Sequence, residues 1–368
     1  MGGAIVHEWI SQAGGSENVL EAMSQLYPDA DIHCLWNDSV GRFAPERIHE
    51  TWLSRTPLRR SKALALPFMP AVWRSLDNND YEWALISSHL FAHHARFNNQ
   101  SDDLRRFVYV HTPARYIWDP ALDLRGNSAA VRAIASTFKP IDRRRANEPA
   151  SFAANSGFVR ARMKDAWGVD SRVIYPPVNV TEIQAVEDWS TKLTVEESET
   201  LATLPHSFVL GASRFIPYKR LDLVIQAGEL SGCPVVIAGK GPELAKLRAL
   251  AVSASVPVHI VVGPSAAMLN TLYQSALIYV FPAIEDFGIM PVEAMAAGTP
   301  VLAHSIGGTA ESVVPGLTGA LVSFDSPEEI YEGFELALAT KKADREAHAR
   351  TFAVERFRSE IFGWVGHG

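Results

Sequence analysis

Short apolar runs alternate with segments of helical periodicity along the whole chain. Short runs bounded by turn residues predict buried strands, and longer segments with apolar residues three or four positions apart predict helices. Strands that alternate with helices predict parallel sheets with crossover helices. In the first half the predicted strands are 4–7, 32–35, 83–87, 107–111, 151–154 and 173–175. In the second half they are 207–211, 234–238, 258–262, 276–281, 300–303 and 320–322.

The two sets of strands predict an α/β protein with two doubly wound, Rossmann-like domains. The sequence Tyr175-Pro-Pro-Val178 ends the first set, and the stretch 181–203, rich in Glu, Ser and Thr, is interpreted as a surface passage into the second. We therefore expect domains at 1–178 and 179–349. Ligands bind at the carboxyl ends of the strands in open α/β sheets, so the cleft between two such domains is the expected site.

Composition excludes several classes of protein. Of the 368 residues 47% are hydrophobic and 20% are charged, and the net charge of −7 argues against a general nucleic-acid binder. The only cysteines, Cys34 and Cys233, form neither a zinc motif nor a disulfide framework, which fits a reducing cytoplasm. The N-terminus lacks the pattern of a signal peptide, and no run reaches the roughly 18 apolar residues of a membrane span.

Two glutamates flank a glycine turn in the second half of the chain. Glu285 follows the apolar run 276–281 and therefore stands at the carboxyl end of a predicted strand. A helix is predicted to start near Pro291 and to end at Gly298, which places Glu293 inside it. Two acceptors beside the N–H groups of a helix N-terminus suit a polyhydroxylated, phosphate-bearing ligand such as a nucleotide sugar. Taken alone, the pair is also explained by a helix cap and a solvated helix residue.

Other predicted strands of the second half lead into cationic or glycine-containing loops. Arg214 and Lys219 follow the first strand, where a guanidinium and an ammonium suit a diphosphate, although such cations are often only solvated. Gly239-Lys-Gly241 is a glycine turn, which is weak evidence by itself. Gly263 opens the segment after the third strand.

The first half carries a glycine pair and a histidine at the ends of predicted strands. Gly14-Gly15 lies before a helix start, where the backbone could approach a phosphate or simply turn. His111 ends an apolar strand and precedes Thr112-Pro113, so its imidazole should emerge at the ligand-binding edge of the sheet or pack there through a hydrogen bond. Asp29-Ala-Asp31 matches the D-x-D pattern of some metal sites, but it lies between a predicted helix and a predicted strand, and no metal site is predicted.

These segments resemble the retaining GT-B glycosyltransferases of family 4. The stretch 281–300 is similar to the family's donor-binding signature, and 109–119 is similar to a motif of a bacterial, mannosyltransferase-like subgroup. The loop at Gly14-Gly15 resembles the family's "GGAE" loop, with Ser16 in place of alanine. The resemblance implies the GT-B fold, in which two Rossmann-like domains face a central cleft. It also implies a C-terminal helix, about 350–368, that packs back on the first domain.

The resemblance also implies a role for each site residue. His111 would lie beside the donor sugar, and Glu285 would orient sugar hydroxyls and stabilise the charge that develops on the ring. Arg115 and Tyr116 would line the acceptor side. Glu293 would hold the ribose. The donor-binding set as a whole is Gly14, Gly15, Arg214, Lys219, Gly263, Phe287, Gly288, Ile289 and Glu293.

The implied activity is transfer of a hexose, with mannose favoured, from a nucleoside diphosphate sugar to a hydroxyl of a saccharide or lipid-linked acceptor. No cofactor or metal is expected, because Arg214 and Lys219 would stabilise the departing nucleoside diphosphate. GDP-mannose is the favoured donor and UDP-glucose is next; Ala266-Ala267 replaces acidic residues of some members, which leaves the base open. The alternatives are a nucleotide-sugar epimerase of the same fold and a nucleotide-sugar-binding protein without turnover.

The segment 51–74 combines five cations, no acidic residue and many bulky apolar side chains. Such a segment could rest on an anionic membrane surface. Alternatively, Trp52, Leu64, Phe68 and Trp73 pack inside the first domain and the cations face water. On the membrane interpretation the acceptor would be a lipid-linked saccharide, and the protein, expected in the cytoplasm, would lie peripherally on the inner face of the membrane.

Overall fold

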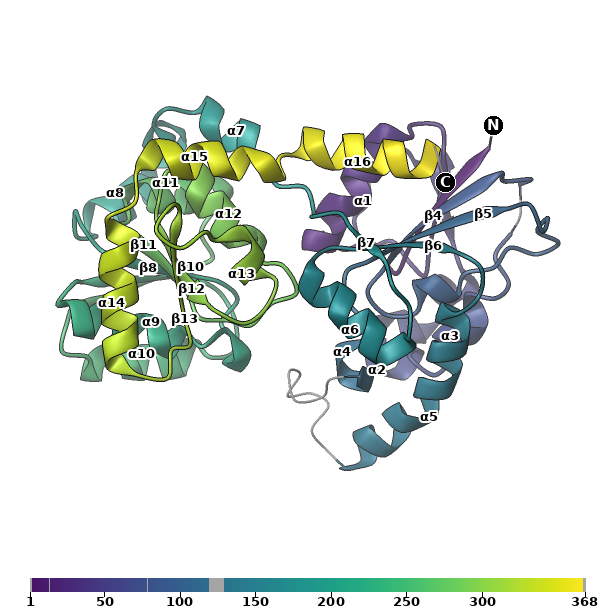
Figure 1. Cartoon of the computed structure of the whole chain (residues 1–368), viewed down its shortest axis with the longest axis horizontal. Coiled ribbons are helices and arrows are strands. Elements are labelled where there is room, and N and C mark those ends of the chain that lie inside the picture. The colour runs from purple at the N-terminus through teal and green to yellow at the C-terminus, as the bar shows by residue number, and fades with distance from the viewer. Residues whose placement is uncertain (1, 13, 78, 119–128, 367–368) are drawn as a thin grey trace. The chain divides into compact units, whose positions relative to one another are not determined.

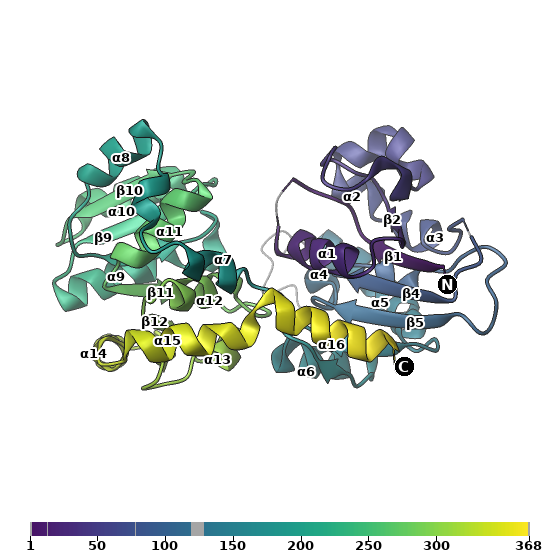
Figure 2. The same ribbon diagram turned by 90° about the horizontal axis from the view of Figure 1, so that it is seen from above.

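The computed structural model describes residues 2–12, 14–77, 79–118 and 129–366, with the backbone alone for Tyr116 and for 129–135. The chain divides into two units by its internal contacts. The N-terminal unit is Met1–Pro177 together with Glu355–Gly368, and the C-terminal unit is Val178–Val354. Each unit is a parallel sheet with helices on both faces (Figures 1 and 2). Such layering buries both faces of a sheet, which explains the nearly continuous apolar strands.

Within the described residues the sheet of the N-terminal unit has seven parallel strands in the order β3-β2-β1-β4-β5-β6-β7. Its central strands are fully buried. Only β3 was not predicted, because it is a three-residue edge strand without a buried residue. The strands are β1 (Gly3–His7), β2 (Asp31–Cys34), β3 (Ile48–Glu50), β4 (Trp83–Ser88), β5 (Arg105–Val110), β6 (Ser151–Ala154) and β7 (Arg172–Val173).

The sheet of the C-terminal unit has six parallel strands in the order β10-β9-β8-β11-β12-β13. All six coincide with predicted strands to within two residues at either end. The strands are β8 (Val209–Ala212), β9 (Val235–Gly239), β10 (Val258–Val262), β11 (Ile278–Phe281), β12 (Val301–His304) and β13 (Gly319–Val322).

The helices connect these strands and cover the two sheets (Figure 1). In the N-terminal unit they are α1 (Gly15–Leu26), α2 (Lys62–Ala65), α3 (Met69–Val72), α4 (Arg115–Trp118), α5 (Ala129–Ala146) and α6 (Gly157–Trp167). In the C-terminal unit they are α7 (Val180–Ala185), α8 (Val195–Ala202), α9 (Leu221–Ser231), α10 (Leu244–Ser253), α11 (Ala266–Ser275), α12 (Ile289–Ala296), α13 (Thr309–Ser312), α14 (Pro327–Leu338) and α15 (Lys342–Ala349). Helix α8, and α7 except for its first residue, lie within the stretch 181–203 that was interpreted only as a surface passage.

The last helix, α16 (Val354–Gly366), packs on the N-terminal unit beside α1 (Figures 1 and 2). Its buried Trp364 donates from Nε1 to Ser151 Oγ at 2.8 Å and meets the ring of Phe107 edge-on. Arg356 donates to the carbonyl oxygen of Tyr175 at 2.7 Å. The final helix therefore completes the core of the unit in which the chain begins.

The strand order reverses between β1 and β4 in the first sheet and between β8 and β11 in the second. Such reversal points place the loops after the two strands on opposite sides of the sheet and open a crevice at their carboxyl ends. The segments that follow β1, β8 and β11, including the starts of the next helices, carry most of the predicted site residues. The two reversal points are the natural places to look for a site in each unit.

Candidate functional site

An ion pair lies at the reversal point of the C-terminal unit. Lys219 ends the 3₁₀ turn Pro217–Lys219 after β8, and Glu285 lies in the loop after β11. Lys219 Nζ donates to Glu285 Oε1, and the two side chains are only 9% and 15% exposed. The rings of Phe281 and Tyr218 lie 5.2 and 5.4 Å from the ammonium. The structure thus joins two predicted site residues that lie 66 positions apart in the sequence.

A glycine loop after β12 supports the turn that carries Glu285. The backbone N–H of Gly308 donates to the carbonyl oxygen of Glu285 at 2.8 Å. A Cβ atom on Gly308 would lie 2.0 Å from the carbonyl oxygen of Asp286, so only glycine fits. The hydroxyl of Thr309 donates to the carbonyl oxygen of Phe287 at 3.1 Å. No role was predicted for this loop from the sequence, although the glycine pair Gly307-Gly308, four residues after the predicted strand 300–303, was a usable signal.

The glycine turn leads into α12 as predicted, with the helix starting at Ile289. Gly288 has a φ of 89° and caps the helix, and a Cβ there would meet the hydroxyl oxygen of Thr309 at 2.4 Å. Phe287 is buried. Glu293 lies on the second turn of α12, and burial raises its pKa to about 7, although the hydroxyl of Tyr273 acts in the opposite direction. This carboxyl group is therefore poised between its neutral and charged forms near neutral pH.

The remaining predicted residues of this unit are more exposed. Arg214 is exposed and donates from Nη2 to the hydroxyl of Tyr218 at 3.1 Å. Gly263 is also exposed, with a φ of 65°, and its N–H donates to the carbonyl oxygen of Gly239 at 2.8 Å. A Cβ on Gly239 would lie 1.8 Å from the carbonyl oxygen of Ser213. The glycine turn after β9 thus allows a close approach of the backbone to the loop after β8.

In the N-terminal unit a serine hydroxyl links two histidines across the reversal point. Ser87 Oγ lies 3.0 Å from His7 Nδ1 and 2.8 Å from His111 Nε2. Burial lowers the pKa of both imidazoles to about 3, so both are neutral at physiological pH. The partly buried His89 lies against His111 and Trp9, with ring centroids at 6.1 and 4.8 Å. The predicted histidine at this edge is therefore part of a larger polar cluster.

The glycine pair at the start of α1 accommodates an acidic side chain. Glu17, which is 3% exposed, accepts the backbone N–H of Ser11 at 3.1 Å and the hydroxyl of Ser16 at 2.8 Å. A Cβ on Gly14 would meet Glu17 Oε2 at 2.2 Å. The glycine at position 14 therefore leaves room for the Glu17 carboxylate beside the start of α1, while the predicted contact of Gly14-Gly15 with a donor stays a prediction.

Two adjacent histidines and an aspartate form a fully buried cluster. Asp142 Oδ1 lies 3.1 Å from His93 Nε2 and 3.0 Å from His94 Nε2. Its other oxygen accepts the indole N–H groups of Trp118 at 2.6 Å and Trp167 at 2.7 Å. Contact with His93 and His94 holds the pKa of Asp142 below its usual range despite burial. Within the described residues these three side chains form the set that lies close enough together to hold a metal ion, and this cluster was not predicted from the sequence.

The predicted acceptor-side residues belong to the short helix α4. Arg115 begins this helix, while the side chain of Tyr116 and the whole of Asp119 lie outside the described residues. Trp118 ends the helix, and its indole is fixed by Asp142 on α5. The buried cluster thus anchors the end of α4 to the rest of the N-terminal unit.

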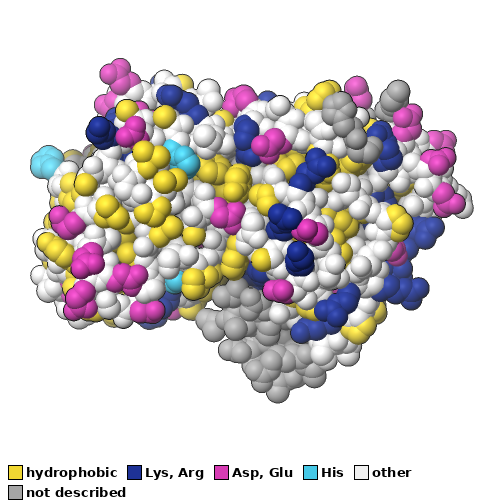
Figure 3. All heavy atoms as spheres, in the orientation of Figure 1, with side chains coloured by type: hydrophobic (Ala, Val, Ile, Leu, Met, Phe, Trp, Pro, Cys, Tyr) yellow, Lys and Arg dark blue, Asp and Glu magenta, His cyan; other side chains and the backbone are white. Residues whose placement is uncertain are grey.

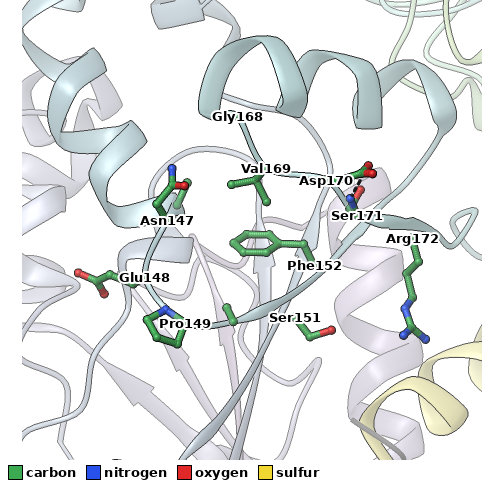
Figure 4. A pocket seen from close by; sticks show the side chains of 12 residues that line it. Asn147, Glu148, Pro149, Ser151, Phe152, Gly168, Val169, Asp170, Ser171 and Arg172 are labelled. Carbon is green, nitrogen blue, oxygen red and sulfur yellow. Dashed lines mark hydrogen bonds between the residues drawn. The ribbon is translucent and has the colours of Figure 1, made fainter.

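A surface hollow lies between the α5–β6 and α6–β7 connections (Figure 4). Phe152 and Val169 face each other across it, with Pro149 at its rim. These residues are at the amino ends of β6 and β7, the opposite edge of the sheet from His111. The hollow therefore has no part in the arrangement at the carboxyl ends.

The segment 51–74 is only partly packed into the N-terminal unit. Trp73 is fully buried, but Trp52, Leu64 and Phe68 are 52%, 63% and 46% exposed. In the view of Figure 3, Lys and Arg side chains are spread over this unit, among apolar and acidic ones. Among the described residues no helix is long and apolar enough to cross a membrane.

Family models match both units of the chain. Residues 13–182 match the family described as Glycosyltransferase Family 4, and residues 197–352 match the family described as Glycosyl transferases group 1. Together the two regions cover most of the chain. Each half of the chain thus resembles a glycosyltransferase family, which agrees with the resemblance that its motifs indicated.

Curated relatives match over part of their length. The chain is 28% identical, over 52% of each protein, to the GDP-mannose-dependent alpha-(1-6)-phosphatidylinositol monomannoside mannosyltransferase of Mycobacterium tuberculosis. It is 33% identical to the D-inositol 3-phosphate glycosyltransferase of Mycobacterium avium, over 41% of this chain and 39% of that protein. The chain spans about half or less of the length of these two relatives.

Solved structures match the whole chain. The Anabaena protein Alr3699/HepE in complex with UDP has a TM-score of 0.71 at 18% identity, covering 99% of this chain and 100% of that one. The sucrose-phosphate synthase of Thermosynechococcus elongatus has a TM-score of 0.70 at 15% identity, covering 100% and 98%. At these identities the likeness establishes the fold, which is GT-B.

Proposed function

We propose that the chain is a retaining glycosyltransferase that moves a hexose from a nucleoside diphosphate sugar to a hydroxyl acceptor. The observation that carries this proposal is the Lys219–Glu285 pair at the reversal point of the C-terminal sheet, followed by the glycine-capped helix with Glu293. A cation suits the diphosphate, and a carboxylate suits the positive charge that develops on the sugar ring. A helix N-terminus adds N–H donors for sugar hydroxyls.

The proposed reaction is a single substitution on one face of the sugar. The bond from the anomeric carbon to the diphosphate oxygen breaks while a bond to the acceptor oxygen forms, and the acceptor proton passes to the departing diphosphate. Lys219 and Arg214 would stabilise the negative charge on the leaving group, and Glu285 the positive charge on the ring. The scheme uses no metal ion, so we expect EDTA to leave the rate unchanged. Loss of activity in EDTA with recovery on adding Mg²⁺ or Mn²⁺ would refute it.

We favour GDP-mannose as the donor, with UDP-glucose next. The mycobacterial relative named as GDP-mannose-dependent supports the first, and the Anabaena structure solved with UDP-glucose is consistent with the second. Labelled GDP-mannose, UDP-glucose and dTDP-glucose would be incubated in turn with the wild type and with Glu285→Gln. We expect release of labelled sugar, or transfer to an added saccharide, from one donor with the wild type only.

The same experiment separates the alternative functions. An epimerase would convert the sugar while the nucleotide stays attached. A binding protein would raise its melting temperature with one nucleotide sugar and leave that sugar intact. If Glu285→Gln lowers the affinity for the nucleoside diphosphate as much as it lowers the rate, Glu285 contacts the nucleotide rather than the sugar.

We further propose that the exposed part of 51–74 contacts an anionic membrane, where a lipid-linked acceptor would lie. Trp52, Leu64 and Phe68 supply exposed apolar surface, and the rings of Trp52 and Phe68 lie 6.5 Å apart. Arg55 and Arg60 are exposed beside them in sequence. Arg59 is paired with Asp38, so it contributes less net charge. Apolar anchors together with cations are the features of a peripheral contact.

Sedimentation with anionic vesicles tests this contact. We expect binding to vesicles of phosphatidylglycerol and phosphatidylcholine at low salt, and its loss in Arg55→Gln/Arg60→Gln. The control Lys246→Gln/Arg248→Gln removes two exposed cations from the C-terminal unit and should bind like the wild type. Absence of binding at low salt, or equal loss in both variants, would favour a soluble acceptor.

A further inference from the structure

Three strands present a row of polar side chains on one face of the N-terminal sheet. His7 pairs with Ser87 across β1 and β4, and Ser87 pairs with Tyr109 across β4 and β5. His111 follows Tyr109 by two positions and, because side chains alternate along a strand, continues on the same face. Ser87 Oγ lies within hydrogen-bond distance of both His7 Nδ1 and His111 Nε2. One hydroxyl therefore connects two imidazoles across the reversal point of the sheet.

The surroundings of His7 decide which way these hydrogen bonds run. His7 is fully buried, and its Nε2 has no hydrogen-bond partner. A buried N–H group without an acceptor is rare in folded proteins, because its lost contact with water is not replaced. The single proton of this neutral imidazole therefore belongs on Nδ1, where it is donated to Ser87 Oγ.

The direction of the second hydrogen bond follows from the first. A serine hydroxyl has one hydrogen and two lone pairs, so Ser87 can accept from His7 and still donate. Its hydrogen then points to His111 Nε2, 2.8 Å away, which accepts it. Since His111 is also neutral, its own ring hydrogen must be on Nδ1.

We propose that Ser87 and His7 are positioning residues, which hold His111 in the Nδ1–H tautomer so that it offers a hydrogen-bond donor at the carboxyl edge of the sheet. The inference rests on the proposed function for its ligand, which would be an oxygen atom of the nucleotide sugar. It assigns His111 the task of donating a hydrogen bond to that oxygen rather than removing a proton. A fixed tautomer serves this task because no rearrangement is needed when the ligand binds.

The tautomer can be read directly by NMR of protein with ¹⁵N-labelled histidine. In the wild type we expect the His111 ring to show a protonated Nδ1 and an unprotonated Nε2, with the signal assigned from His111→Asn. In Ser87→Ala the two nitrogens should move toward averaged shifts, and Ser87→Thr should restore the wild-type pattern. The control Ser88→Ala removes the neighbouring hydroxyl, which bonds His93 instead, and should leave the His111 signals in place.

Two variants of His7 test the direction of the hydrogen bonds that run from His7 through Ser87 to His111. Asparagine keeps an N–H donor near the position of Nδ1, so His7→Asn should preserve the His111 tautomer. His7→Phe removes this donor, so the hydroxyl of Ser87 can accept from His111 instead, and the tautomers should mix. A protonated Nε2 on His111 in the wild type, or a pattern unchanged in Ser87→Ala and His7→Phe, would overturn the inference.

Turnover of GDP-mannose or UDP-glucose supplies a second readout. We expect Ser87→Ala to lower kcat about tenfold with little change in KM, and Ser87→Thr to recover most of it. An equal kcat in Ser87→Ala and wild type would overturn the positioning role. If neither donor is turned over by the wild type, the proposed function fails, whereas the NMR measurement still decides the tautomer.

Discussion

Lys219 Nζ donates to Glu285 Oε1, so a residue assigned to the diphosphate and a residue assigned to the sugar are direct partners. Each neutralises the other while both are largely buried. Binding of a diphosphate would give the ammonium a second anionic partner. If a donor binds as proposed, its diphosphate and its sugar would be coupled through this one ion pair, so variants of the two residues should not act independently.

The first prediction concerns this coupling in stability. Lys219→Ala leaves the Glu285 carboxylate buried without its cation, so it should cost about 3 kcal/mol of unfolding free energy. Adding Glu285→Gln should recover part of this loss, with a coupling energy of about 1–3 kcal/mol. Urea unfolding of the two single variants and the double variant measures it.

The control for this cycle is Arg220→Ala. Its ion pair with Asp222 joins side chains that are 52% and 38% exposed, so its loss should change stability by less than about 0.5 kcal/mol. Additive effects of Lys219→Ala and Glu285→Gln would mean that the pair is not coupled in the folded protein.

The second prediction concerns the glycine loop beneath Glu285. In Gly308→Ala the new methyl group would lie 2.0 Å from the carbonyl oxygen of Asp286, so the turn must shift. We expect a loss of about 1–3 kcal/mol in stability and a drop in turnover. Gly363→Ala is the control, because nothing lies within 4 Å of its added Cβ and the residue is inside α16. Gly363→Ala should be neutral or slightly stabilising. If Gly308→Ala behaved in the same way, the loop at Gly308 would not support the turn that carries Glu285.

The third prediction is a pH dependence of stability from Glu8. This side chain is fully buried and accepts the backbone N–H groups of Leu90 at 2.8 Å and Ala92 at 2.7 Å, while its Oε2 has no partner. Burial raises its pKa from 4.5 to about 7. The folded state holds this proton more tightly than the unfolded state does. Glu8 therefore stabilises the folded protein below pH 4.5, and this stabilisation is lost as the pH rises to about 7.

Comparison with Glu8→Gln isolates this contribution, since the amide does not titrate. The unfolding free energy of the wild type minus that of the variant should fall by about 3 kcal/mol between pH 4.5 and pH 8. Urea unfolding across this range measures the difference. Parallel pH profiles would show that the carboxyl group has the same pKa in both states.

The fourth prediction concerns the buried aspartate on α5. Asp142→Asn replaces a carboxylate that accepts two indole N–H groups and faces two imidazoles, so donors are left without an acceptor. We expect a loss of about 3–5 kcal/mol in stability and a changed tryptophan fluorescence. The control Asp170→Asn removes a surface partner of Arg160 and should leave both unchanged. Wild-type stability in Asp142→Asn would show that the network is not needed to hold α4.

Sequence patterns were sufficient to predict the two sheets, because strands buried on both faces are short, apolar and separated by helices. They failed at β3, an edge strand with too few buried positions to leave a pattern. Lys219 and Glu285 were each placed at a strand end, but their contact depends on the conformation of two loops and on strand order. Neither determinant is visible in local sequence.

The cluster of His7, Ser87 and His111 also could not be assembled from local sequence. His111 was singled out through its motif, whereas His7 and Ser87 look like polar residues at the ends of apolar strands. Their relation to His111 appears only when β1, β4 and β5 are placed side by side. Polar side chains inside otherwise apolar strands were the available signal, because buried polar groups require partners.

The return of α16 to the N-terminal unit affects the order in which the protein can be completed during synthesis. Trp364 and Phe357 close the core around β5 and β6, yet they leave the ribosome after the whole C-terminal unit. Until then the nascent first sheet exposes an apolar face, a state in which chaperones bind and chains aggregate. The two ends of the C-terminal unit, by contrast, lie side by side, because Val178 pairs with Ala353. A chain that stops before Glu355 should therefore yield a folded second half attached to an aggregation-prone first half.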